Sequence, residues 1–224
     1  MINWADIDTV LLDMDGTLLD LHFDNHFWLE HLPKIFAQQK NISIDHAKDH
    51  LFKTSNSLQG TLNWYCLDFW TEELGIDIAE LKKDIQHKIG FRPHVEDFLT
   101  ALGLTGKQRI LVTNAHRDSL DLKLSNTNLQ DYLDIIISSH DYQEPKESQA
   151  FWQHLQKAQP FDPTRTLLID DSLSVLASAQ KYGIQHLLCI NKPDSQNPSR
   201  NIETFKSVEH FSDIMPSTIG DNKD

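Results

Sequence analysis

Residues 8–17 read DTVLLDMDGT, an apolar run that ends in two aspartates and a glycine. A short run of this kind, closed by turn residues, predicts a buried strand over 8–13. Asp13 and Asp15 then lie at the carboxyl end of that strand, and Gly16 lets the chain turn. Ligands of open α/β sheets bind at this edge, so the segment predicts a site as well as a fold class. Taken alone, it is also compatible with a plain acidic turn.

Further apolar runs along the chain have the length of buried strands. They are 109–113, 134–138, 166–170 and 185–190. Amphipathic patterns typical of helices lie between them, at 94–104, 117–128, 147–158 and 172–183. Strands that alternate with helices in this way indicate crossover connections between parallel strands. We therefore predict an α/β fold with a doubly wound parallel sheet.

The alternation is interrupted once, after the first strand, by a stretch that is too long for one crossover. This stretch has helical patterns at 24–38, 44–57, 62–74 and 78–89. Apolar residues recur there at the helical period, which is typical of a bundle with its own buried face. We predict that residues 20–92 form an inserted helical cap, and that 1–19 and 93–224 form the core.

The composition limits the classes of partner. The 224 residues carry 20 Lys and Arg against 33 Asp and Glu, a formal net charge of −13. Such a surface repels the phosphates of nucleic acid and of anionic lipid, so no nucleic-acid polymer and no membrane is expected as a partner. A small anionic substrate stays compatible, because a local cation or lysine can offset the average charge.

Cysteine use and the N-terminus bear on the compartment. Cys66 and Cys189 form no CxxC pair, so their spacing predicts neither a zinc site nor a disulfide framework. The N-terminal residues are acidic where a signal peptide needs basic ones, and no apolar run is long enough to span a membrane. We expect a cytoplasmic protein.

Other polar residues lie at the same predicted edge as the two aspartates of the first strand. Thr113 and Asn114 end the second strand, Asp170 and Asp171 end the fourth, and Lys146 follows the third. Each of them alone is explained as well by a turn, a helix cap or a solvated loop. Because the carboxyl ends of parallel strands meet at one edge, the combination predicts a shared site.

These residues carry a resemblance to a known family. DMDGT at 13–17, the threonine of LVTN, Lys146 and IDDS at 169–172 resemble, in order and spacing, the four motifs of the haloacid dehalogenase (HAD) superfamily. The helical insert after the first motif is similar to that superfamily's small cap. Four more segments, FDNHFW, LNWYCLDFW, KQRILVTNAH and NKPDS, resemble its purine 5′-nucleotidases. The resemblance covers nearly the whole chain and implies hydrolysis of purine nucleoside monophosphates, GMP and IMP.

The resemblance also implies roles for single residues. Asp13 is the nucleophile that forms an aspartyl phosphate, and Asp15 is the general acid and then the general base. Lys146, the Thr113 hydroxyl and Asn114 bind the phosphoryl group. The substrate implied is a small phosphate ester.

Such a site concentrates negative charge. Two like charges ~4 Å apart repel by roughly 4 kcal/mol at an effective dielectric of about 20, and several carboxylates meet a phosphate dianion here. A divalent cation relieves this repulsion, and oxygen ligands with a phosphate favour Mg²⁺. The expected ligands are Asp13, Asp171 and, in the manner of the family, the backbone carbonyl of Asp15. Asp170 is expected as a second or water-mediated ligand.

The cap is expected to select the substrate, because the core contacts chiefly the phosphoryl group. Trp64 can stack on a purine base, and the Asn63 amide can hydrogen-bond to a base edge. The helical spacing of apolar residues around them is also compatible with a buried face, so packing within the cap stays open for Trp64. His116, just after Thr113 and Asn114, is expected to be a solvated residue at a helix start.

Other functions use similar residues. A phosphatase for a sugar phosphate or a pyrimidine nucleotide needs the same core, and a phosphomutase uses the same aspartates with a bisphosphate intermediate. A phosphorylatable receiver-like signalling module also gathers acids, a threonine and a lysine at a sheet edge. The long helical insert, and Asp15 two residues after Asp13, favour the hydrolase over the signalling module.

Overall fold

The computed structural model describes residues 2–216, so residue 1 and residues 217–224 of the predicted core lie outside the described part. Six parallel strands form one sheet in the order β3-β2-β1-β4-β5-β6. Their bounds are β1 Thr9–Leu12, β2 Gln108–Thr113, β3 Ile135–Ser138, β4 Thr166–Asp170, β5 His186–Ile190 and β6 Ser207–Val208. The predicted strand over 8–13 is therefore the central one, paired with β2 and β4.

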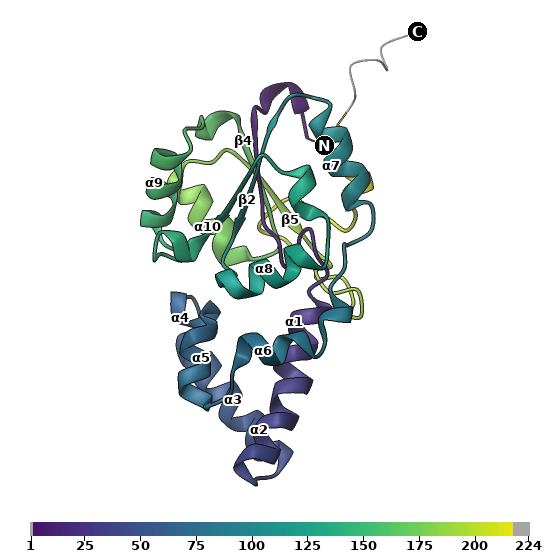
Figure 1. Cartoon of the computed structure of the whole chain (residues 1–224). Helices are drawn as coiled ribbons and strands as arrows, with labels where there is room; N and C mark the ends of the chain where they lie inside the picture. The colour runs from purple at the N-terminus through teal and green to yellow at the C-terminus, as the bar shows by residue number, and fades with distance from the viewer. Residues whose placement is uncertain (1, 217–224) are drawn as a thin grey trace.

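Helices cover both faces of the sheet (Figure 1). α7 (Val95–Gly103) and α8 (Arg117–Ser125) pack on one face, and α9 (Gln149–Ala158) and α10 (Leu173–Tyr182) on the other. Successive residues of a strand point to opposite faces, so Val10 and Leu12 join the first cluster while Leu11 joins the second. The prediction of a doubly wound α/β sheet is confirmed.

The inserted stretch between β1 and α7 is helical and lies beyond one end of the sheet (Figure 1). Its helices are α1 His22–His26, a π-helical turn Phe27–His31, α2 Leu32–Lys40, α3 Ile44–Leu58, α4 Leu62–Tyr65, α5 Leu67–Leu74 and α6 Ile78–Lys83. They bury a separate apolar cluster that includes Phe23, Phe27 and Trp70. The two connections to the core run side by side, because the Asp20 N–H donates to the Gly90 carbonyl at 2.9 Å. On this basis we propose residues 20–92 as the cap.

Two predicted helices of the cap differ from the observed ones. The helix predicted over 62–74 is broken at Cys66, whose backbone is extended (φ −84°, ψ 112°). The indole of Trp70 donates to the Trp64 carbonyl at 3.0 Å, so a side chain occupies an acceptor that a continuous helix would use. The helix predicted over 78–89 ends at Lys83 and is followed by a 3₁₀ turn.

Short elements complete the chain. The two-residue strand β6 was missed, because a run of two residues carries no periodicity. The 3₁₀ turns are Trp4–Asp6, Gln86–Lys88, Leu129–Tyr132, Ser139–Asp141, Pro163–Arg165 and Phe211–Ile214.

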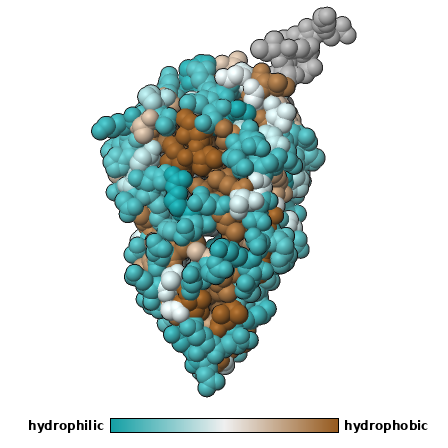
Figure 2. Space-filling view, viewed as in Figure 1, coloured by the Kyte–Doolittle hydropathy of each residue, from teal (hydrophilic) through white to brown (hydrophobic). Residues whose placement is uncertain are grey.

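The surface is mostly polar. Hydrophilic residues cover most of the face shown in Figure 2, and hydrophobic residues gather over parts of the core and of the cap. Among residues 2–216, no helix combines the length and the apolar character needed to cross a bilayer.

Candidate active site

Three carboxylates meet where the two central strands end. The register pairs Leu12 with Ile169, and the Asp13 N–H donates to the Ile169 carbonyl at 3.0 Å, so Asp13 lies beside Asp170. One carboxylate oxygen from each of Asp13, Asp170 and Asp171 lies within 4.8 Å of the other two. The edge predicted from the sequence therefore does bring these residues together.

Lys146 reaches into this cluster from the loop after β3. Its ammonium lies 2.6 Å from Asp13 Oδ1, 2.7 Å from Asp170 Oδ2 and 3.0 Å from the Val112 carbonyl. The side chain is 2% exposed. Burial opposes the charge of Lys146, but Asp13 and Asp170 outweigh that effect and hold its pKa above the usual value. The lysine is therefore a fixed positive charge between two carboxylates.

Asp171 lies close to Gly16, in the loop that follows β1. Gly16 has φ +83°, and a Cβ built on it would lie 2.8 Å from Cγ of Asp171, so only glycine allows this approach. The Arg200 guanidinium donates to the Asp171 carbonyl at 2.7 Å and lies 4.0 Å from its carboxylate. Arg200 was not anticipated, because it lies in a polar loop without regular periodicity.

Burial governs the electrostatics of these acids. It raises the pKa of Asp13 to about 6, against the opposing effect of Lys146. It raises the pKa of Asp171 well above the usual value, and the neighbouring carboxylates of Asp13 and Asp170 add to the rise. Two buried carboxylates and one that is mostly shielded, with one lysine between two of the three, carry more negative charge than this lysine neutralises. The donor set, oxygen atoms alone, fits a hard divalent cation such as Mg²⁺.

Asp15 belongs to a second charged cluster, which links the core to the cap. Lys123 of α8 donates to Asp15 Oδ1 at 2.6 Å and to Asp24 Oδ2 of α1 at 2.7 Å. Lys82 of α6 donates to the other oxygen of Asp24 at 2.7 Å. Burial, partly opposed by Lys123, raises the pKa of Asp15 to about 6.

The members of this second cluster other than Asp15 are not predicted from the sequence. A signal was present, since Lys123 follows the buried Leu120 by three residues and shares its helix face. A lysine in phase with apolar residues has to find an acidic partner when it is buried, and Asp24 is that partner.

The loop after β2 connects to the cap through Glu147. Asn114 accepts from the Lys146 backbone N–H at 2.9 Å and donates to Glu147 Oε2 at 3.0 Å. Tyr65 of the cap donates to the other oxygen of Glu147 at 2.8 Å. Thr113 is buried, and its hydroxyl accepts from the Ala115 N–H at 3.0 Å. Glu147 also went unrecognised in the sequence, where it is one acid among many.

A cavity of about 880 Å³ lies between core and cap. Its floor includes Asp13, Asp15, Asp170, Asp171, Thr113, Asn114 and Lys146, and its cap wall includes Trp28, Phe52, Trp64 and Trp70. Asn63 is exposed and is not among the lining residues, so the structure does not place it where it could read a base in this cavity.

Two further expectations concern aromatic and histidine side chains. Trp64 lines the cavity and also packs on the cap cluster, with its indole donating to Ser55 Oγ at 2.8 Å.

The expectation of a solvated His116 is wrong, because its side chain is 13% exposed. As the N-cap of α8, His116 accepts from the Asp118 N–H through Nδ1.

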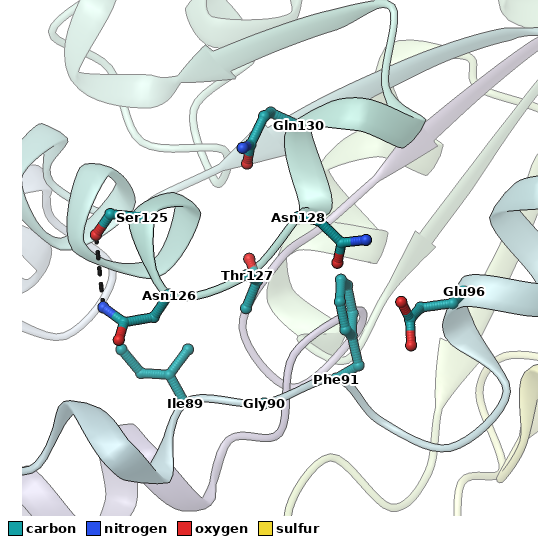
Figure 3. A pocket seen from close by; sticks show the side chains of 9 residues that line it. All are labelled: Ile89, Gly90, Phe91, Glu96, Ser125, Asn126, Thr127, Asn128 and Gln130. Atoms are coloured by element: carbon teal, nitrogen blue, oxygen red, sulfur yellow. Dashed lines mark hydrogen bonds between the residues drawn. The ribbon is translucent and has the colours of Figure 1, made fainter.

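A second hollow, of about 470 Å³, lies at the hinge between cap and core (Figure 3). It is open to the surface and is lined by residues 89–91, Glu96, 125–128 and Gln130. In Figure 3 most of its side chains are amides and hydroxyls from the end of α8 and the segment that follows it, and Asn128 lies near Phe91 and Glu96. This lining offers one carboxylate and no cluster of charged groups, unlike the larger cavity.

Comparisons with known proteins agree with this architecture. The haloacid dehalogenase-like hydrolase family matches residues 10–189. The chain is 40% identical over 218 residues to the GMP/IMP nucleotidase YrfG of Escherichia coli. The aligned residues cover 97% of this chain and 98% of that protein. A protein of the same name from Shigella flexneri matches equally well.

Solved structures show the same fold. A HAD phosphatase from Thermococcus onnurineus aligns with a TM-score of 0.77 at 22% identity, over 93% of this chain and 96% of that one. A magnesium-bound HAD-hydrolase, YfnB from Bacillus subtilis, aligns with a TM-score of 0.63 at 19% identity, over 93% of this chain and 96% of that one. The family match spans most of the chain and includes the first, second and fourth strand ends with Lys146, so the chain belongs to the haloacid dehalogenase-like hydrolases.

Proposed function

We propose that this hydrolase is a Mg²⁺-dependent phosphatase of purine nucleoside monophosphates, GMP and IMP, acting through an aspartyl phosphate. The observation that carries the proposal is the convergence of Asp13, Asp170, Asp171 and Lys146 on the floor of one large cavity under the cap. Phosphate-monoester hydrolysis is among the slowest uncatalysed reactions, so its catalyst needs dense charge and fixed geometry. The site has both.

In the first step, a carboxylate oxygen of Asp13 attacks phosphorus, and the bond between phosphorus and the ribose oxygen breaks. Asp15 donates a proton to that leaving oxygen. Its raised pKa, near 6, keeps a larger share of the acid protonated than an exposed aspartate would have. In the second step, Asp15 takes a proton from water, which attacks the phosphoryl group and restores Asp13.

Other residues hold the phosphoryl group. Lys146, fixed beside Asp13, supplies a positive charge to the oxygens on which negative charge builds up. The Thr113 hydroxyl and the Asn114 amide supply neutral donors. Asp13, Asp171 and Asp170 would hold the metal together with the Asp15 carbonyl. When bound, Mg²⁺ supplies charge neutralisation and orients the phosphoryl oxygens.

The proposal of a purine nucleotide rests on the curated relatives and on the cavity wall. Proteins 40% identical over nearly the whole chain carry the name GMP/IMP nucleotidase. The volume of about 880 Å³ falls in the range of small-molecule sites, roughly 300–1,000 Å³, and exceeds what a phosphate alone would need. Phe52 in the wall offers an exposed aromatic face to a base, and Trp64 lines the same wall.

A screen tests this function directly. The purified protein with Mg²⁺ is given GMP, IMP, pyrimidine monophosphates and sugar phosphates, and free phosphate is measured. We expect the highest kcat/KM for GMP and IMP. Preference for a sugar phosphate or a pyrimidine nucleotide would reject the substrate and keep the phosphatase. Transfer of phosphate within the substrate, without release, would indicate a phosphomutase, and a stable phosphoprotein without turnover would indicate a receiver-like module.

A further inference from the structure

Three side chains with soft or borderline metal-binding atoms meet where the cap touches the core, apart from the acidic cluster. Cys66 lies between α4 and α5 of the cap, His116 caps α8 of the core, and His140 lies in the 3₁₀ turn after β3. One possible ligand atom from each lies within 4.8 Å of the other two. The rings of His116 and His140 meet edge-on, with centroids 5.0 Å apart and planes at 83°.

The backbone fixes each of these three positions. Cys66 is extended where the predicted helix breaks, and the Trp70 indole holds the preceding turn. His116 is held as a helix N-cap, and His140 follows Ser138, which closes a capping box over its turn. The three side chains are therefore brought together by defined local structure and not by mobile loops.

His140 has an unsatisfied nitrogen. Its Nε2 is fully buried, and none of residues 2–216 forms a hydrogen bond with it. A buried nitrogen without a partner costs free energy, so such atoms in a native fold call for an explanation. Burial, aided by the charge that His116 would carry, lowers the pKa of His140 to about 4. The ring is therefore neutral near pH 7 and offers a lone pair.

We propose that Cys66, His116 and His140 form a Zn²⁺ site that joins the cap to the core. A thiolate with two imidazoles is a donor set for Zn²⁺ and a poor one for Mg²⁺, which prefers oxygen. The thiol loses its proton to solvent on binding. Tetrahedral Zn²⁺ with these bond lengths separates its ligand atoms by about 3.3–3.7 Å, so side-chain shifts of about 1 Å complete the site.

A zinc site also needs a group that orients the histidine ring and a fourth ligand, and two carboxylates near His116 can supply them. Asp118 Oδ2 lies 3.6 Å from His116 Nδ1. When Nε2 binds the metal, the ring proton moves to Nδ1, which then donates to this carboxylate in place of accepting from the Asp118 N–H, and the carboxylate orients the ring as acids behind metal-bound histidines do. Asp68 Oδ2 lies 3.5 Å from His116 Nε2. Asp68 or a water molecule is then available as the fourth ligand.

The site would restrain the movement of the cap. His116 follows the loop of Thr113 and Asn114 in the core, whereas Cys66 follows Trp64 and Tyr65 in the cap wall. A metal bonded to both holds the cap against the core. Substrate has to enter and product to leave beneath the cap, so Zn²⁺ at this site slows turnover. This effect on turnover rests on the proposed phosphatase function, while the binding of metal does not.

Binding is tested on the full chain with Co²⁺ as a spectroscopic substitute for Zn²⁺, in saturating Mg²⁺ so that the acidic cluster is filled. We expect one equivalent of Co²⁺ to produce a thiolate-to-cobalt charge-transfer band in the near ultraviolet, and Zn²⁺ to displace it. Cys66→Ser should abolish the band, with Cys189 still present as the matched thiol. His140→Gln should weaken Zn²⁺ affinity by at least the ~10–100-fold that loss of a supporting residue costs metal sites. His154→Gln, at an exposed position on α9, should leave affinity unchanged.

The same variants also define the results that would contradict the proposed Zn²⁺ site. Absence of the band, or its persistence in Cys66→Ser, overturns the site, and so does unchanged Zn²⁺ affinity in His140→Gln. Melting temperatures measured without Zn²⁺ establish that each variant is folded. In the turnover assay, Zn²⁺ should inhibit the wild type and leave Cys66→Ser and His140→Gln active, whereas Zn²⁺ acting at the acidic cluster would inhibit all three. A protein that binds Co²⁺ through Cys66 but hydrolyses no phosphate ester would reject the proposed function and keep the metal site.

Discussion

At the scale of single residues, the structure distinguishes three neighbouring carboxylates by their partners. Asp13 and Asp170 share the ammonium of Lys146, whereas Asp171 has Arg200 at 4.0 Å. Asp170 also accepts from the Ser172 N–H at 2.8 Å through its other oxygen. Both oxygens of Asp170 are therefore engaged, which leaves Asp171 freer to bind a metal directly.

Asp13→Asn should abolish turnover and leave the fold intact, because an amide has nearly the same shape but cannot form the acyl phosphate. Lys146 keeps Asp170 as a partner in this variant. Phosphate release and melting temperature are measured together. Steady-state hydrolysis near the wild-type rate would reject Asp13 as the nucleophile.

Asp15→Asn should lose most activity toward a nucleotide and much less toward an activated aryl phosphate, because a good leaving group needs little protonation. The expected difference is roughly 10²–10⁴-fold, the usual contribution of general acid catalysis. The check is the ratio of kcat/KM for the two substrates in variant and wild type. Equal losses on both would contradict the assigned role.

Removal of divalent metal with a chelator should abolish hydrolysis, and Mg²⁺ should restore it. Asp171→Ala should raise the Mg²⁺ concentration needed for half-maximal activity more than Asp170→Ala does. Titration of activity with Mg²⁺ gives both values. The reverse order would assign the direct ligand to Asp170, and full activity without any divalent ion would refute the electrostatic argument.

At the scale of elements, a buried ion cluster holds α1, α6 and α8 together. Asp24 of α1 accepts from Lys82 and Lys123, each about 1% exposed. Lys82 also lies over the rings of Phe23 and Phe27, at 4.8 and 4.7 Å from their centroids. Asp24 thus bridges two buried lysines, of which Lys123 also has Asp15 as a partner whereas Lys82 is paired with Asp24.

Asp24→Asn should lower the free energy of unfolding by about 3–5 kcal/mol, because it leaves the buried ammonium of Lys82 without its counter-charge, while Lys123 keeps Asp15. Urea denaturation at pH 7 measures the loss. Asp49→Asn is the matched control, since Asp49 pairs with Lys53 at 2.7 Å on the exposed side of α3 and should contribute nothing measurable.

The pH dependence of this loss has a defined sign. Burial opposes the charge of Asp24, but Lys123 and Lys82 outweigh it and lower its pKa. A lowered pKa stabilises the fold above the unfolded value, about 3.9, and that contribution is lost as the pH falls below it. The difference between wild type and Asp24→Asn should therefore shrink below about pH 4. A constant difference down to pH 2 would contradict the assignment.

At the scale of the whole molecule, the cavity exists only because the cap is placed over the sheet edge. Phe52 of α3 lines it with 69% of its surface exposed, whereas Trp64 is partly buried and packs against the cap cluster. An exposed ring is available to a ligand, and a packed ring is already engaged. Variants of the two residues therefore distinguish recognition of a base, expected at Phe52, from stability of the cap, expected at Trp64.

Phe52→Ala should lower kcat/KM for GMP and IMP by about one to two decades, the loss of stacking worth roughly 1–3 kcal/mol, without lowering the melting temperature. An aryl phosphate without a base should be nearly unaffected. Trp64→Ala should lower the melting temperature and impair all substrates together. The reverse pattern would assign base recognition to Trp64.

The sequence by itself determined the sheet, its central strand and most of the polar residues that meet at its edge. Apolar runs of strand length identify β1 to β5, and parallel strands necessarily bring Asp13, Thr113 and Asp170 to one edge. The length of the insert and its helical period likewise predicted a cap. The prediction of the sheet succeeds because it depends on local periodicity and on a rule of sheet topology.

Only the tertiary structure decided which residues meet across the two domains. Lys82, Lys123 and Asp24 come from three separate helices, and Cys66, His116 and His140 lie far apart in the chain. No spacing rule links such positions, since the orientation of cap and core sets their distances. The break at Cys66 also depends on a contact with Trp70 that local propensity does not contain. Contacts between domains follow from packing of the folded elements, and a linear pattern does not encode that packing.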